Sequence, residues 1–339
     1  MRCPVSTPAD SSRKLSVIDS HTCGQPTRVI VDGIPDIGYS TIAEASEALA
    51  SEHDWVRRLA VFEPHGHRAL FAVALIPPSS PDAAHGVVFM DAAGYHGMCG
   101  HATIGVATTL VECGLLGVGE GTSEFALDTP IGLVVVRVRV EGGRARSVTF
   151  VNQPAYFLTT VSIASPRGPV HVHVAFGGQW YAFVDARSFD LEITPANIPL
   201  LVSLAADIRP LIQQALAVDG TRGVAPGDVR NVMWFDDPPP HADGRNMPVN
   251  VAGAFDRSPC GTGTSARLAV LHYQRTLDVG QTYVNAGVLG TVYHGRIASE
   301  TASGAQRTLI PEITGSAWIT GRADLWVAND DPLADGFLL

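Results

Sequence analysis

Hydrophobic and polar positions along the chain change their spacing in a way that separates strands from helices. Where polar and apolar residues alternate, as Arg137 and Arg139 do between valines, the pattern predicts a strand. The run 101–113 is apolar or small nearly all round, which predicts a helix buried on every side. Further helices are predicted over 41–59, 198–217 and 264–276. Other strands are expected over 17–22, 60–62, 69–76, 86–90, 147–151, 170–175, 181–184, 229–234, 281–285, 288–293 and 317–328.

These elements occur in the same order twice: strands, a helix, strands, a cysteine, a helix, strands. The repetition predicts an α+β protein of two similar halves, each a strand-rich layer wrapped on one central helix. We assign residues 14–153 with 315–339 to the first half and 154–314 to the second. The polar segment 1–13 is expected to be a disordered lead.

Size and charge exclude several classes of protein. A chain of 339 residues, 46% hydrophobic and 17% charged, is sufficient for about two packed domains. The net charge of −10 argues against nucleic acid, and apolar runs such as 134–136 are too short to cross a membrane. Five widely spaced cysteines and a polar start favour reduced thiols in the cytoplasm.

Lysine usage excludes one cofactor. Lys14 is the only lysine among 23 basic residues. Pyridoxal phosphate forms its Schiff base with a lysine, and Lys14 lies in the polar lead. Any chemistry at an amino-acid α-carbon is therefore expected to proceed without that cofactor.

Cys99 and Cys260 lie in matching local sequences, GMCGHAT at 97–103 and SPCGTGT at 258–264. Each precedes a predicted helix, whose N-terminus lowers the pKa of a thiol and presents free N–H groups. If the halves face each other, these N–H groups can hold one carboxylate with its α-carbon between two sulfurs. One thiolate would then remove the α-proton while the opposite thiol donates a proton to the other face. The N–H groups concerned are those of Gly100, His101, Gly261 and Thr262.

The segments MCGHATIG at 98–105 and DRSPCGTGTSAR at 256–267 resemble the signatures of the proline racemase / hydroxyproline epimerase family. DSHT at 19–22, PTR at 26–28, EP at 63–64 and GGQW at 177–180 match further blocks, so the resemblance runs from about 17 to 332.

The resemblance implies the diaminopimelate-epimerase-like fold, with two pseudo-symmetric domains and an active site in the cleft between them. It also implies a cofactor-independent isomerase in which Cys99 and Cys260 transfer protons. His101 and Asp256 would flank the ring nitrogen of a proline-like substrate. The substrate contacts that the family pattern implies are Gly100, His101, Asp256, Gly261 and Thr262.

Cys260 separates this chain from a dehydratase branch that carries threonine there. Trp180 and the ending DDP at 330–332 resemble 4-hydroxyproline 2-epimerases, which convert trans-4-hydroxy-L-proline to cis-4-hydroxy-D-proline. Proline racemase is the alternative within the family. A monomer or a homodimer is expected, with a small-molecule substrate as the partner.

Two rival classes stay open at this point. His65 with His67, and His171 with His173, would each share a face of a strand and could hold a metal, although alternation of polar and apolar residues explains both pairs. A two-lobed chain could also be a non-catalytic amino-acid binding protein. A redox role is weak without a Cys-x-x-Cys motif. We expect neither metal nor cofactor, and the roles of Cys23, His65 and His67 are not assigned.

Overall fold

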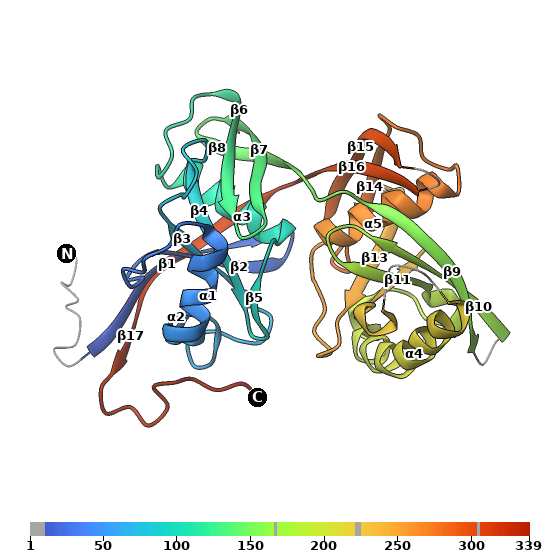
Figure 1. Ribbon diagram of the computed structural model, residues 1–339, viewed down its shortest axis with the longest axis horizontal. Coiled ribbons are helices and arrows are strands. Elements are labelled where there is room, and N and C mark those ends of the chain that lie inside the picture. The colour runs from blue at the N-terminus through green and yellow to red at the C-terminus, as the bar shows by residue number, and fades with distance from the viewer. Residues whose placement is uncertain (1–10, 166–167, 221–224, 304–305) are drawn as a thin grey trace. The chain divides into compact units, whose positions relative to one another are not determined.

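The computed structural model describes residues 11–165, 168–220, 225–303 and 306–339. The chain folds into two compact units (Figure 1). The first contains residues 26–148, the N-terminal segment to Thr22 and 316–339; the second contains 149–315 with Cys23–Gln25. Cys3 and most of the predicted lead lie outside the described residues.

The first unit is built on one buried helix with strands around it. Its paired strands follow the order β17–β1–β2–β3–β4–β6–β7, and β5 pairs with the end of β4. Its helices are α1 (Ile42–Glu52), α2 (Trp55–Val61) and α3 (Gly100–Glu112). Its strands are β1 (Ser11–Thr22), β2 (Gln25–Asp32), β3 (Phe71–Ile76), β4 (His85–Asp91), β5 (Gly94–His96), β6 (Gly121–Thr129), β7 (Gly132–Glu141), β17 (Ala317–Ala328) and β8 (Arg144–Val151), which continues into the second unit.

The second unit pairs its strands in chain order from β9 to β16, and a bridge between Ala155 and Leu309 links the start of β9 back to β16. Its helices are α4 (Ile198–Asp219) and α5 (Gly261–Tyr273), with short 3-10 turns at Ala186–Phe189, Pro195–Asn197 and Pro226–Asp228. Its strands are β9 (Tyr156–Ser165), β10 (Gly168–Phe176), β11 (Trp180–Asp185), β12 (Asn231–Asp236), β13 (Gly244–Val249), β14 (Thr282–Ala286), β15 (Val292–Ser303) and β16 (Gln306–Gly315).

The two units share one topology. In the first, β2–β3 and β4–β6 are parallel, and the pairs β3–β4 and β6–β7 are antiparallel. In the second, β11–β12 and β13–β14 are parallel, and β12–β13 and β14–β15 are antiparallel. The buried helix occupies the same place in each series, because α3 lies between β4 and β6 and α5 between β13 and β14. Equivalent connections therefore deliver Cys99 and Cys260 to equivalent helix starts.

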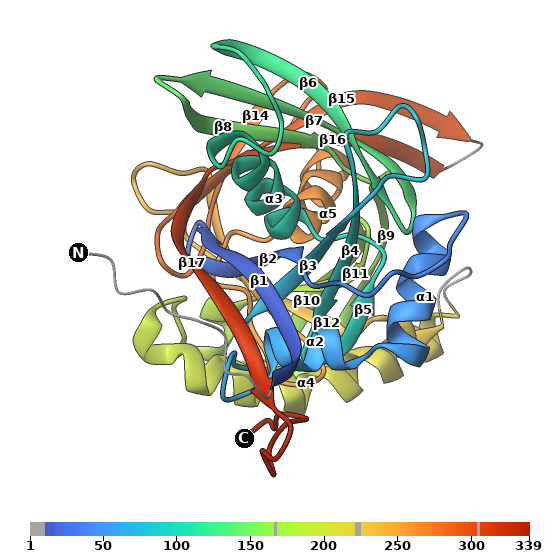
Figure 2. The same ribbon diagram turned by 90° about the vertical axis from the view of Figure 1, so that its left-hand side faces the viewer.

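Burial of α3 and α5 explains why neither helix shows a polar stripe. Every residue of α3 from Gly100 to Leu110 is buried, and α3 packs against β1, β3 and β17. Figure 2 shows β1 and β17 side by side, as their antiparallel register requires. The α5 helix is buried from Gly261 to Ala266 and packs against β9, β10, β15 and β16. Each unit thus has a helix at the centre of its core rather than on its surface.

One helix differs from the expectation that no segment is long and apolar enough to cross a membrane. Residues 195–219 pass that test by length and composition, with a mean hydropathy of 1.2. The helix α4 within this segment nevertheless has one buried face, formed by Leu201, Ala205, Ile208, Ile212 and Leu216, which belongs to the core of the second unit. This one-sided burial is typical of an amphipathic helix packed on a sheet.

Three predicted elements are wrong in their bounds. The single helix expected over 41–59 is two helices, because α1 ends at the cap residue His53 and α2 begins at Trp55. The strand expected over 60–62 is the end of α2, whose valines pack into the hydrophobic core of the first unit. The strand expected over 288–293 is mostly a turn with Gly290 at φ 76°, and β15 begins at Val292. Residues 11–13, expected in the lead, form the start of β1.

Candidate active site

Cys99 occupies the N-cap of α3 in extended backbone, with φ −145° and ψ 120°. Its carbonyl accepts hydrogen bonds from the backbone N–H and the hydroxyl of Thr103, at 2.9 and 2.8 Å, which fixes the first turn. Its Sγ lies 3.2 Å from Nδ1 of His101. An imidazole at this distance can exchange a proton with the thiol.

Packing holds His101 in place. The residue is 7% exposed, and its ring meets Phe71 edge to face with 5.0 Å between the ring centres. Its backbone carbonyl accepts a 2.8 Å hydrogen bond from the hydroxyl of Thr22. The first unit therefore brings together Cys99, Gly100 and His101, the three residues predicted from the first signature.

Cys260 caps α5 in a strained conformation. Its φ of 64° lies in the left-handed region that side chains rarely adopt, at a cost of roughly 1–3 kcal/mol. In this conformation its Sγ accepts a 3.3 Å hydrogen bond from the backbone N–H of Gly263. A Cβ on Gly263 would lie 2.1 Å from Cε of Met233 and 3.1 Å from the sulfur, so a larger residue there would displace the end of the Met233 side chain beside the thiol.

Buried polar side chains hold the segment before Cys260. The carbonyl of Pro259 accepts hydrogen bonds from Asn246, Asn285 and Thr264 at 3.1, 3.3 and 3.1 Å. These three side chains are at most 3% exposed. Strained backbone persists only where its surroundings over-determine it. This clamp on the Pro259 carbonyl supplies that constraint at the position next to the thiol.

Asp256 reaches Cys260 through one intermediate residue. Its carboxylate accepts a 2.8 Å hydrogen bond from the backbone N–H of Ser258, and the Ser258 hydroxyl accepts one from the backbone N–H of Cys260 at 3.1 Å. The second unit therefore brings Asp256, Cys260, Gly261 and Thr262 into one loop and helix start. All four were predicted from the second signature.

The pKa of the Cys260 thiol is raised, whereas the sequence predicted that it would be lowered. Burial, with a smaller contribution from the negative charge of Asp256, raises its pKa to about 12. Hydrogen bonds from Tyr181, Gly263 and Thr262 act in the opposite direction. A helix N-terminus contributes typically 0.3–1 kcal/mol, whereas full burial can shift a pKa by several units, so burial prevails.

Several residues near Cys260 were not predicted as site residues, and Tyr181 and Ser258 are two of them. Tyr181 lies on β11 with its hydroxyl 3.4 Å from the Cys260 sulfur, and Ser258 bonds to the Cys260 amide. Tyr181 directly follows the GGQW block, which was the available signal. A lone tyrosine in an apolar strand pattern is indistinguishable from a core residue, so only the fold identifies it.

The predicted histidine pairs do not behave alike. His65 and His67 lie outside the strands, contrary to the expectation, and burial followed by the charge of Arg28 lowers the pKa of His65. His171 and His173 do lie on β10, where His173 contacts Thr160 and Gln274 at 2.8 and 3.1 Å. Among the residues that the structure describes, no group of three or more His, Cys, Asp or Glu could hold a metal.

Two residues of the family blocks have a structural role. The guanidinium of Arg28 forms a bidentate pair with Asp19 at 2.8 and 2.9 Å. A third nitrogen donates to the carbonyls of Ala60 and His65 at 2.9 and 2.8 Å. Arg28 thus joins β1, β2, the end of α2 and the loop after it, which explains why a buried arginine stands there.

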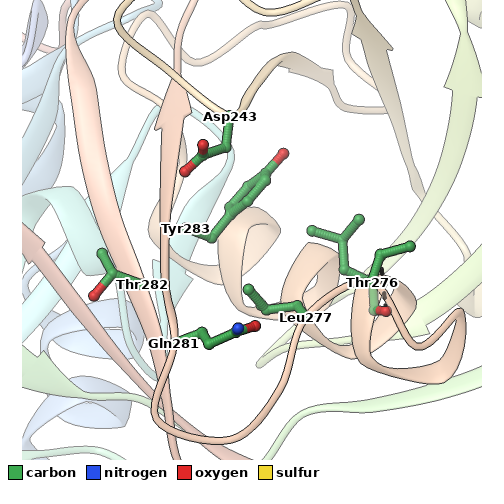
Figure 3. Close-up of a pocket in the computed structure, with 7 residues that line it drawn as sticks. Asp243, Thr276, Leu277, Gln281, Thr282 and Tyr283 are labelled. Atoms are coloured by element: carbon green, nitrogen blue, oxygen red, sulfur yellow. Dashed lines mark hydrogen bonds between the residues drawn. The ribbon is translucent and has the colours of Figure 1, made fainter.

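A pocket of about 480 Å³ lies near the C-terminal end of α5 (Figure 3). Asp243, Leu271, Leu277 and Tyr283 are among the residues that line it. Leu271 follows Cys260 by about three helical turns, roughly 16 Å along the axis. The pocket contains none of the predicted site residues.

Comparisons with known proteins agree with the signature segments. The family model described as proline racemase matches residues 17–338. A 4-hydroxyproline 2-epimerase from Streptosporangium roseum is 40% identical over 97% of this chain and 99% of its own length. A proline racemase from Clostridioides difficile is 38% identical over 97% of this chain and 99% of its own length.

Solved structures show the same fold. A hydroxyproline epimerase from Agrobacterium vitis, solved with bound trans-4-hydroxy-L-proline, has a TM-score of 0.83 and 28% identity over 97% of both chains. A predicted epimerase from Pseudomonas aeruginosa, at 14% identity and a TM-score of 0.56, shares the fold alone and covers 92% of this chain and 99% of its own. The fold class is therefore the α+β diaminopimelate-epimerase-like class, as predicted. The chain belongs to the proline racemase family and is an isomerase of the racemase and epimerase type.

Proposed function

We propose that this protein is a 4-hydroxyproline 2-epimerase that converts trans-4-hydroxy-L-proline to cis-4-hydroxy-D-proline. The observation that carries the proposal is the repeated placement of a cysteine at the N-cap of a buried central helix, α3 in the first unit and α5 in the second. Two thiols delivered by equivalent connections suit a reaction in which two bases exchange roles. The relatives named 4-hydroxyproline 2-epimerase, and the neighbour with bound trans-4-hydroxy-L-proline, support the substrate.

In the proposed mechanism one cysteine thiolate removes the α-proton, breaking the Cα–H bond, and the other thiol donates its proton to the opposite face of the carbon. The atoms balance, because one sulfur gains the α-proton of the substrate while the other sulfur gives its own proton to the same carbon, and the reverse reaction exchanges the roles. The mechanism requires both sulfurs to reach one α-carbon. It uses no cofactor.

The N-terminal amides of α3 and α5, at Gly100, His101, Gly261 and Thr262, are proposed to bind the substrate carboxylate. They would stabilise the negative charge that spreads onto the carboxylate as the proton leaves. Asp256 would offset the charge of the ring ammonium, with His101 on the other side of that nitrogen. The raised pKa of Cys260 makes it a proton donor before substrate binds.

Proline racemase is the second candidate, because the proline racemase from Clostridioides difficile is nearly as similar as the epimerase from Streptosporangium roseum. Trp180 favours the epimerase through the sequence pattern. In the structure its ring packs on Phe176 and Tyr156, with ring centres 5.1 and 5.5 Å apart.

The test is polarimetry of dialysed protein with trans-4-hydroxy-L-proline and L-proline side by side, with and without a chelator. We expect the optical rotation of trans-4-hydroxy-L-proline to fall faster than that of L-proline. The kcat/KM for the hydroxylated substrate should be at least tenfold above that for L-proline, and the chelator should change neither rate. A preference for L-proline would establish the racemase instead. Binding without any change of rotation would leave only an amino-acid binding protein.

A further inference from the structure

Tyr181 places a hydroxyl beside the sulfur of Cys260 in the interior of the second unit. The hydroxyl lies 3.4 Å from Sγ of Cys260 and 2.6 Å from Oγ1 of Thr262. Tyr181 is 3% exposed and stands on β11, a strand in the middle of the sheet order. Its position is therefore set by the fold, whereas Thr262 lies on the first turn of the same helix that Cys260 caps.

The two hydroxyls can bond to Cys260 in either of its protonation states. Each hydroxyl has one proton to donate and lone pairs that accept. When the sulfur carries a proton, the S–H can donate to Tyr181, which donates to Thr262. When the sulfur is a thiolate, Thr262 can donate to Tyr181, which donates to the sulfur. Apart from the proton on the sulfur, the two arrangements differ only by rotation of the hydroxyl protons.

Burial favours this reversal over ionisation of the tyrosine. Burial, then the nearby sulfur of Cys260, raises the pKa of Tyr181 well above its ordinary value. The hydroxyl therefore keeps its proton and acts as a neutral donor or acceptor. Cys99 has a different neighbour, the imidazole of His101 at 3.2 Å. The two thiols thus have different hydrogen-bonding neighbours: a hydroxyl at Cys260 and an imidazole at Cys99.

We propose that Tyr181 is a positioning residue whose hydrogen bond with Thr262 reverses direction each time Cys260 gains or loses its proton. The proposal deepens the two-base reaction and rests on the proposed function. It assigns Tyr181 two effects: it lowers the cost of forming the Cys260 thiolate, and it keeps the sulfur in one orientation in both halves of the catalytic cycle.

The test measures alkylation of Cys260 by iodoacetamide between pH 7.5 and 9.5, resolved from Cys99 by peptide mass spectrometry, in Tyr181→Phe. This change removes the hydroxyl and keeps the ring. A hydrogen bond to a charged group is worth roughly a factor of ten in such an equilibrium, so Cys260 should react about tenfold more slowly at each pH while Cys99 is unchanged. The matched control is Tyr283→Phe, a buried tyrosine of this unit whose hydroxyl bonds to Arg267, and this change should alter neither rate.

Thr262 supplies the second comparison, which does not depend on how Tyr181→Phe folds. Thr262→Val should slow alkylation of Cys260 as Tyr181→Phe does. Thr262→Ser keeps the hydroxyl, so Cys260 should react at the wild-type rate in that variant. The double variant Tyr181→Phe with Thr262→Val should slow alkylation of Cys260 by less than the product of the two single-variant factors. A wild-type alkylation rate in Tyr181→Phe, or equal slowing of Cys99, would overturn the proposal.

The alkylation readout is independent of turnover. If neither hydroxyproline nor proline is isomerised, the proposed function fails, and the reactivity of Cys260 still decides whether Tyr181 stabilises its thiolate. If turnover is found, Tyr181→Phe should lower kcat by about tenfold with little change in KM, since the hydroxyl acts on the sulfur rather than on the substrate.

Discussion

Gly177 sets how closely the loop after β10 can approach the start of α5. A Cβ added there would lie 2.4 Å from the backbone oxygen of Thr262 and 2.4 Å from the backbone nitrogen of Ala266. Ordinary contact begins near 3.4 Å, so Gly177→Ala must separate the loop from the helix by about 1 Å. The clash falls on backbone atoms, which have no rotamer that could relieve it. The same change would strain the 3.0 Å hydrogen bond from Asn152 to the Gly177 carbonyl.

The expected cost follows from these two contacts. Overpacking of this kind costs about 1–3 kcal/mol, and a weakened buried hydrogen bond adds about 1 kcal/mol, which gives roughly 2–4 kcal/mol of lost stability. A displacement of about 1 Å at the start of α5 should also lower kcat/KM by about 100-fold. Urea denaturation and polarimetry measure the two effects.

A matched variant separates this close approach from a general effect of replacing glycine. Gly227→Ala lies in the same unit, and a Cβ there would meet no heavy atom within 4 Å. Its free energy of unfolding should lie within about 0.5 kcal/mol of the wild-type value, and it should keep full activity. If Gly177→Ala matches Gly227→Ala in both measurements, the position of α5 does not depend on this contact and the reasoning is refuted.

Two further changes test other parts of the structure. Because burial raises the pKa of Cys260 to about 12, its alkylation rate should rise about tenfold per pH unit from pH 7.5 to 9.5; a plateau below pH 8.5 would show an already ionised thiol. Arg28→Ala should cost about 3–5 kcal/mol in urea denaturation, because it leaves the partly buried Asp19 and two carbonyls without their partner. A loss below 1 kcal/mol would mean that Arg28 does not hold β1, β2 and α2 together.

The repeat, the two buried helices and the placement of Cys99 and Cys260 at their starts could be predicted from the chain. The matching Cys-Gly segments mark helix starts because glycine and small polar residues there precede a run without a polar face. The break at His53 was not predicted, because no glycine or proline marks it and apolar residues recur on both sides, and packing of Val56 and Leu59 turns the second helix inward.

The environment of the thiols was beyond sequence reasoning. A helix start predicts a lowered thiol pKa, but the extent of burial decides the sign at Cys260, and burial depends on strands far away in the chain. Tyr181, Asn246 and Asn285 come from three different strands, and nothing in their local sequence links them to Cys260. Their roles appear only when the strands are paired.

The most direct test of two-thiol proton transfer follows the α-hydrogen in deuterated water. Incubation with trans-4-hydroxy-L-proline should give cis-4-hydroxy-D-proline that carries deuterium at Cα from the first turnovers, while the remaining substrate stays unlabelled. Cys99→Ala and Cys260→Ala should each lower the rate of epimerisation at least about 100-fold. Product that keeps its original α-hydrogen, or full epimerisation by either variant, would contradict the account.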